Sequence, residues 1–153
     1  CMFLIKQASK SDRLMLKKAA LQGAIMGGHL NLCMCIMEWG LSAQDVVDTC
    51  ALTNAAIHGH LEICKFFIEH VGLKPDQVRG KNNSTLLMAA KTNHAHICHY
   101  LLTKSGLNER DLNYVLRRVE RTLSSRLKSD LETRHCIIAK SCLAQVGKEL
   151  YNK

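Results

Sequence analysis

The feature that most constrains this chain is an internal repeat of a little over thirty residues. The stretch Gly28–Cys33 returns as Gly59–Cys64 and again, in altered form, as Asn93–Cys98, at steps of 31 and 34 residues. A second landmark stays in phase with the first and begins with Gly-Leu at Gly40, Gly72 and Gly106, at steps of 32 and 34 residues. A period in this range is the signature of an architecture in which each unit stacks on its neighbours.

Each unit has the pattern of two helices separated by a break. In the second unit the break lies at Gly59, and the apolar positions on its two sides form two helical stripes. The first stripe consists of Leu52, Ala55 and Ala56, and the second of Leu61, Ile63, Cys64, Phe67 and Ile68. Small residues at 55–56 and 89–90 predict close approach of neighbouring helices. The glycines of the second landmark predict left-handed caps after each second helix.

The last third of the chain leaves the repeat but keeps a helical period. One apolar series is Leu112, Val115, Leu116, Val119, Leu123 and Leu127, and a second is Leu131, Ile137, Ile138, Leu143, Val146 and Leu150. Residues 109–153 are therefore predicted to form two amphipathic helices. They would cover the last repeat, whose open face would otherwise aggregate.

These repeats resemble ankyrin repeats over residues 17 to about 113. Ser84–Ala90 is similar to the family's Thr-Pro-Leu-His-Leu-Ala-Ala, and Gly59–Glu69 is similar to its second-helix signature. No unit has the Thr-Pro dipeptide, and the linkers lack the family's Asp-x-x-Gly turn. Asn82 stands where that turn has Gly, and Asn tolerates a positive φ. Two forms of the linkers therefore stay open, namely β-hairpin fingers and short helical turns that begin at the Gly-Leu pairs.

The fold expected from the repeat and from the resemblance is an all-α, ankyrin-like helical-repeat solenoid with a C-terminal helical cap. The expected division of the single domain (1–153) is repeat 1 at 10–41, repeat 2 at 42–73, repeat 3 at 74–107, and a degenerate repeat or cap at 108–153. The linker form also resembles divergent ankyrin proteins of large DNA viruses and microbial eukaryotes. Because the first residue is Cys1 and not Met, we expect either a segment of a longer protein or a residue left over from cloning.

The cysteines and the apolar runs of the sequence indicate the kind of compartment in which the protein is found. The eight cysteines are spread along a chain long enough to fold without disulfides, and several lie among apolar residues at helical spacing. We interpret them as reduced, buried thiols, which indicates the cytoplasm or another reducing compartment, that of the host cell for a viral protein. No apolar run approaches the roughly 18 residues needed to cross a bilayer.

The formal charge is +8 and is shared evenly, with +4 on residues 1–108 and +4 on residues 109–153. The densest basic stretch consists of Arg110, Arg117, Arg118, Arg121, Arg126, Lys128 and Arg134. A solvated helix face explains this stretch, because Leu and Val alternate with the basic residues. The alternative function, nucleic-acid binding through the 110–134 face, stays open, although aromatic residues for base stacking are scarce.

Metal binding and catalysis have weak support in the sequence. His94, His96, Cys98 and His99 are residue types that bind zinc. However, the repeat places Cys98 in the core, and the ankyrin resemblance implies a structural role for His94. Cysteine and histidine could form a nucleophilic site, yet no third member, nucleophile elbow or phosphate loop is present. No cofactor, metal or enzymatic activity is expected. Trp39, Met34 and Met37 are expected to fill the core.

The ankyrin resemblance implies a protein-binding module that presents a concave surface of linker loops and first helices. Carried onto this chain, the partner-binding surface consists of Gln44, Asp48, Asn54 and His58 from the second unit, with Arg79, Lys81, Asn82, Lys91 and Asn93 from the third. The partner is expected to be a protein of acidic character, with no role for a membrane.

Overall fold

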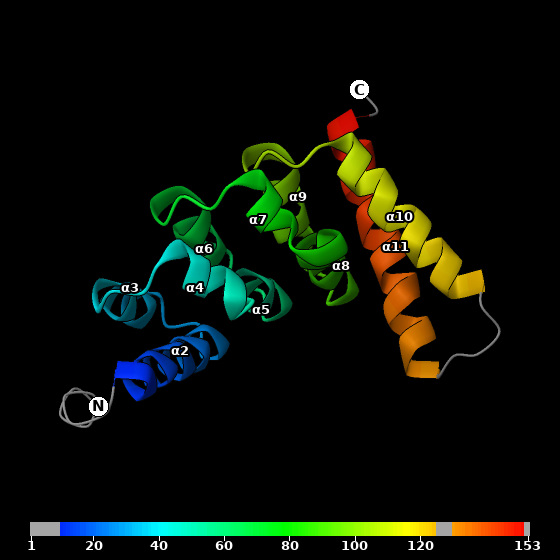
Figure 1. Cartoon of the computed structure of the whole chain (residues 1–153). Coiled ribbons are helices and arrows are strands. Elements are labelled where there is room, and N and C mark those ends of the chain that lie inside the picture. Colours follow the sequence, from blue (N-terminus) through cyan, green and yellow to red (C-terminus); the bar gives the residue numbers. More distant parts are fainter. Residues whose placement is uncertain (1–9, 125–129, 152–153) are drawn as a thin grey trace.

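The computed structural model describes the backbone of residues 10–124 and 130–151 and the side chains of residues 11–122 and 134–151. Every regular element in these ranges is a helix, and they contain no strand. Figure 1 shows helix pairs following one another in a curved row, from the blue N-terminal end to the C-terminal hairpin in yellow, orange and red. The predicted all-α repeat solenoid is confirmed, and the described linkers contain no β-hairpin finger.

Three helix pairs form the repeats. They are α2 (Lys10–Met26) with α3 (Leu30–Glu38), α5 (Ala51–Ile57) with α6 (Leu61–Lys65), and α8 (Ser84–Lys91) with α9 (Ala95–Lys104). A π-helical turn, η1 (Phe66–His70), extends α6. The first helices stack directly, with α5 packed between α2 and α8. This stacking gives each pair the apolar partner surface that it lacks alone.

The linkers between repeats are helical, which is one of the two forms that the sequence left open. They form α4 (Ala43–Asp48), α7 (Pro75–Arg79) and the short turn η2 (Lys81–Asn83). In each copy of the landmark, the residue before the helix donates its main-chain amide to an acceptor side chain three residues further along. The Ser42 amide donates to Asp45 at 2.9 Å, the Lys74 amide to Gln77 at 2.9 Å and the Asn108 amide to Asp111 at 3.0 Å. The capping requirement explains why this landmark recurs.

The predicted left-handed positions are present. Gly40, Gly72 and Gly106 have φ of 89°, 75° and 77°. Asn82, the replacement for the turn glycine, has φ of 58°. Asn93 has φ of 62° at the place that Gly59 occupies in the preceding repeat, where φ is 80°. The altered third copy therefore keeps the backbone conformation of the other two.

The predicted burial of the small residues between helices and of the three in-register cysteines is confirmed. Ala55, Ala56, Ala89 and Ala90 are fully buried, as are Cys33, Cys64 and Cys98. Trp39 and Met37 are half-buried against the core, as expected. Met34 is 40% exposed, and Cys35 and Cys50 are exposed, so the expectation that these three residues are buried was wrong. In repeat 1, α3 packs on α2 and α6, and Met34 lines a cavity together with Phe66 and Val71, which leaves its side chain partly open to solvent.

Histidine joins each repeat to the one before it. The His60 ring lies against Gly28, with Nε2 3.4 Å from the carbonyl oxygen of Met26. The His94 ring lies against Gly59 in the same way, with Nε2 3.0 Å from the carbonyl oxygen of Ile57. The predicted structural role of His94 is confirmed, and the same contact explains the glycine at the break between helices.

The C-terminal hairpin consists of α10 (Glu109–Ser124) and α11 (Asp130–Tyr151). Figure 1 shows the two helices side by side, and α11 also packs on α8 and α9. The buried residues of α10 include Leu112, Val115 and Val119, as predicted. Leu127 and the side chains of Leu123 and Leu131 lie outside the described residues.

The predicted buried face of α11 needs correction. Ile137 and Ile138 are 56% and 38% exposed, whereas Cys136, Ala139 and Cys142 are buried together with Leu143 and Val146. The prediction assumed that the bulky residues face the core. The buried face of α11 instead packs against α8, α9 and α10 together, and small residues lie at these contacts. No helix in the described part of the chain is long and apolar enough to cross a lipid bilayer.

Candidate functional site

The nine residues predicted to bind a partner come from the linker helices and the ends of the first helices. Six are exposed, namely Gln44, Asp48, His58, Lys81, Asn82 and Asn93, and three are half-buried, namely Asn54, Arg79 and Lys91. They lie on α4, on the end of α5, on α7 and the η2 turn, and on the end of α8 and the turn after it. Binding by these residues stays a prediction.

Several of these side chains have partners within the chain. Gln44 donates to Asp48 at 2.8 Å, and Nδ1 of His58 lies 2.9 Å from the carbonyl oxygen of Asn54. Lys18 on α2 forms ion pairs with Asp45 at 2.9 Å and with Asp48 at 3.8 Å. Hydrogen bonds from Lys18 and Ser42 lower the pKa of Asp45 to about 2. The α4 linker is thereby tied to the preceding repeat.

A cavity of about 380 Å³ opens between the second and third repeats. Its apolar wall is made of Val46, Val47, Leu52 and Leu73, and its polar lining of Asp48, Cys50, Thr53, Gln77, Lys81, Ser84 and Thr85. Across the repeat boundary the Thr53 and Thr85 hydroxyls are hydrogen-bonded at 3.0 Å. Of the nine predicted residues, the cavity brings together Asp48 and Lys81.

Sequence reasoning missed the other lining residues, above all Cys50. Cys50 precedes α5 in the left-handed region, with φ of 52°, and Asn83 precedes α8 with φ of 53°. Asn tolerates this conformation, and the repeat register aligns the two positions. The alignment of Cys50 with Asn83 could therefore have predicted that Cys50 lies at an exposed turn and not in the core.

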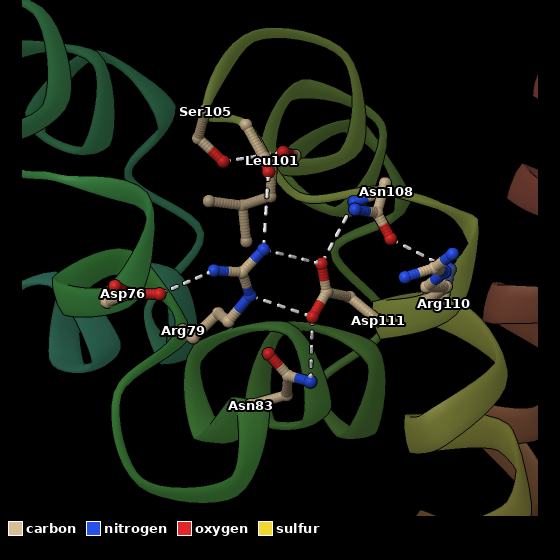
Figure 2. A network of polar contacts seen from close by, with 9 residues as sticks. Asp76, Arg79, Asn83, Leu101, Ser105, Asn108, Arg110 and Asp111 are labelled. Atoms are coloured by element: carbon tan, nitrogen blue, oxygen red, sulfur yellow. Dashed lines mark hydrogen bonds and ion pairs between the residues drawn. The ribbon is translucent and has the colours of Figure 1, made fainter.

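Figure 2 shows a second feature, an ion-pair network that joins the third repeat to α10. Arg79 binds both carboxylate oxygens of Asp111, with Nε 2.8 Å from Oδ1 and Nη2 3.2 Å from Oδ2, and its Nη1 lies 2.7 Å from Asp76. The Asn83 amide also donates to Asp111, at 3.2 Å. Arg79 thus holds α7 against α10. The sequence predicted Arg79 only as a residue that contacts a partner.

Asp111 is the centre of this network. Its side chain is only 10% exposed. Burial alone would raise the pKa of Asp111, but the hydrogen bonds from Arg79, the Asn108 amide and Asn83 together lower it. A carboxylate that accepts several hydrogen bonds while paired with a guanidinium stays ionised. The network is therefore a fixed structural joint at the end of the repeat stack.

The histidines and cysteines do not converge on one point. His96 and His99 are exposed on α9, whereas Cys98 is fully buried, in contact with Cys142 on α11. Among the described residues, no group of three or more His, Cys, Asp or Glu side chains could hold a metal ion. The seven described cysteines are free thiols.

The exposed thiols Cys35 and Cys50 are expected to react with iodoacetamide much faster than the buried thiols of the native protein. Burial raises the pKa of Cys33 to about 11 and that of Cys64 to about 12, so that near pH 8 roughly one buried thiol in a thousand or fewer is ionised. Peptide mass spectrometry after brief labelling, with and without denaturant, measures the difference. Rapid native labelling of Cys64 would contradict this core assignment.

The sequence profile described as Ankyrin repeats (3 copies) matches residues 21–114, which contain the three helix pairs from within α2 onward. No curated protein and no solved structure matches the chain. Ankyrin-repeat domains are typically non-catalytic and generally mediate interactions between proteins. The matched profile, the phased landmarks and the stacked helix pairs agree, and the chain belongs to the ankyrin-repeat family.

Proposed function

We propose that this domain binds a partner protein through the surface formed by α4, α7, the η2 turn and the ends of the first helices. The observation that carries the proposal is the cavity between the second and third repeats, which has an apolar wall and a charged rim. Asp48 and Lys81 lie at this rim, and both are exposed.

The composition of the cavity suits recognition of a protein side chain. An apolar side chain of the partner would displace water from the wall around Val47 and Leu73. The carboxylate of Asp48 and the ammonium of Lys81 would then select polar groups beside that anchor. A few buried anchors within a polar rim are typical of protein interfaces.

The surface is also held in place before binding. The Lys18 ion pairs fix α4 on one side of the cavity, and the Thr53–Thr85 hydrogen bond crosses the repeat boundary beneath it. The Arg79–Asp111 pair fixes α7 on the other side. A preformed surface loses less conformational entropy when it binds its partner.

The proposal is tested by site-specific photo-crosslinking followed by thiol blocking. A photo-crosslinking amino acid at position 81 is expected to capture a protein that the same amino acid at position 99, on α9, does not capture. The captured protein is then purified. We then measure the affinity of the captured protein for a form of this domain in which a bulky maleimide modifies Cys50. This form carries Cys1→Ser and Cys35→Ser, so that these two thiols do not react.

Modification of Cys50 is expected to weaken binding by about tenfold or more, because the adduct fills the cavity. The matched control carries the same maleimide on Cys35, on the outer face of α3, in a Cys1→Ser, Cys50→Ser background. This control is expected to bind within about twofold of the unmodified protein. Equal losses in the two adducts, or no loss in either, would show that the partner does not use the cavity.

A further inference from the structure

The exposed face of α10 carries a row of arginines at helical spacing. Arg110, Arg117 and Arg121 are separated by seven and four residues, and Tyr114 stands between the first two, so all four lie on one side of the helix. All four are exposed, Tyr114 by 46%, while Leu112, Val115 and Val119 are buried on the opposite side. We call these four residues the α10 arginine stripe. At 1.5 Å per residue it is about 16 Å long.

The positive charge of this stripe is not neutralised within the described part of the chain. Of the three acids on α10, Asp111 pairs with Arg79, and Glu120 lies 3.0 Å from Lys140. The third, Glu109, lines a cavity with Gly147 and Tyr151 of α11, away from the stripe. Among the described side chains, no carboxylate forms an ion pair with the three arginines of the stripe.

The stripe adjoins the partner-binding surface proposed above. The Tyr114 hydroxyl lies 3.5 Å from the side-chain oxygen of Asn82, and Arg118 donates to the Asn82 main-chain carbonyl at 2.9 Å. Lys81, at the rim of the cavity, is the residue before Asn82 and is exposed. The Asp111 network fixes the N-terminal turn of α10 against the same linker. One positive surface therefore continues from the third repeat onto the hairpin.

We propose that the α10 arginine stripe binds an acidic segment of the partner protein, which extends the proposed protein-binding function and depends on it. Guanidinium groups form bidentate hydrogen bonds with carboxylates, and each turn of the stripe presents such a group or the Tyr114 ring. A length of about 16 Å corresponds to about five residues of extended chain. The ring supplies an apolar contact between the charged positions.

A protein ligand is favoured over a nucleic acid by the aromatic content of the surface. Tyr114 is the one aromatic residue of the stripe, and single-stranded nucleic acids are typically held by several stacked aromatic rings. The basic residues that would extend the surface along 110–134 do not all belong to it, since α10 ends at Ser124 and Arg134 lies on α11. Arg126 and Lys128 lie outside the described residues.

The test uses a fluorescein-labelled twelve-residue polyglutamate peptide, with polyglutamine of the same length and single-stranded and duplex DNA of matched charge as comparisons. Anisotropy is measured at about 150 mM salt, where screening limits nonspecific attraction. The variant Arg117→Glu plus Arg121→Glu is compared with Lys65→Glu plus Lys104→Glu, on α6 and α9. Each pair of changes lowers the formal charge from +8 to +4.

Polyglutamate is expected to bind more tightly than polyglutamine or DNA, and the stripe variant is expected to lose about tenfold or more in affinity, against less than about twofold for the control variant. Equal losses in the two variants would overturn the proposal, because net charge alone would then explain binding. Tighter binding of DNA that is lost in the stripe variant would overturn it in favour of nucleic acid. Absence of polyglutamate binding would also overturn it.

These outcomes are separable from failure of the proposed function. If the captured partner requires an unblocked Cys50 while polyglutamate does not bind, the cavity proposal stands and the stripe proposal fails. If blocking Cys50 leaves the partner's affinity unchanged, the proposed function fails, whatever the result with polyglutamate.

Discussion

Replacement of Gly59 by alanine is expected to lower the free energy of unfolding by about 2 to 4 kcal/mol. Gly59 has φ of 80°, a conformation that strains a residue with a Cβ. A Cβ there would also lie 2.6 Å from Cε1 of the His94 ring. The ring would have to move away, and its hydrogen bond to the Ile57 carbonyl would be lost. Chemical denaturation followed by circular dichroism measures the change.

Gly72 provides the matched control for Gly59. Its φ of 75° is nearly the same, but no atom lies within 4 Å of the Cβ that alanine would add. Gly72→Ala is therefore expected to cost only the backbone strain, about 1 kcal/mol. In a protein that already carries His94→Ala, the loss of unfolding free energy caused by Gly59→Ala should be similarly small, because the ring that the Cβ would meet is absent. If the two glycine variants unfold alike in the parent background, the proposed histidine contact is wrong.

The second large effect is expected at the joint between the third repeat and α10. Asp111→Ala should lower the free energy of unfolding by about 2 to 3 kcal/mol, because it leaves Arg79, the Asn83 amide and the Asn108 amide without their shared acceptor. The Arg79 side chain is 28% exposed, and water there limits the loss. Denaturation monitored by circular dichroism measures this loss, and hydrogen exchange of α10 amides should reveal local opening.

Asp76 is the control for the Asp111 variant, since it pairs with the same arginine but its side chain is 94% exposed. Asp76→Ala is expected to change stability by less than about 0.5 kcal/mol. The pKa of Asp111 is lowered in the folded state, so its contribution is present above the unfolded pKa of about 3.9 and is lost as pH falls through the folded value. Between pH 5 and 2 the Asp111 variant should therefore lose less stability than the parent. Identical acid profiles would contradict the network.

The helices and the stacking order could be predicted because the evidence for them lies in short stretches of sequence. The positions of Gly40, Gly72 and Gly106 follow from the conformation that ends a helix, and the burial of Ala55 and Ala89 follows from close helix contact. Repetition strengthened these inferences, since each copy places the same requirement on the same position. Where one copy changed, as at Asn93, the replacement still tolerates the required φ.

The candidate site was less predictable because its parts come from different repeats. Arg79 and Asp111 are 32 residues apart, and nothing in their local sequences indicates that they pair. The predicted binding set included Arg79 as a surface residue and left out Asp111. Cys50 was assigned to the core by its residue type, whereas its left-handed turn leaves it exposed at the cavity.

The sequence by itself determined the helical repeat, its period, its caps and the family, because backbone conformation and helical periodicity depend on neighbouring residues. Only the tertiary structure decided which face of α11 is buried, which acids of α10 are paired, and where the cavity opens. These outcomes depend on distances between elements far apart in the chain. Ile137 on α11 is exposed and Cys136 beside it is buried because α8 and α9 approach one side of that helix and not the other.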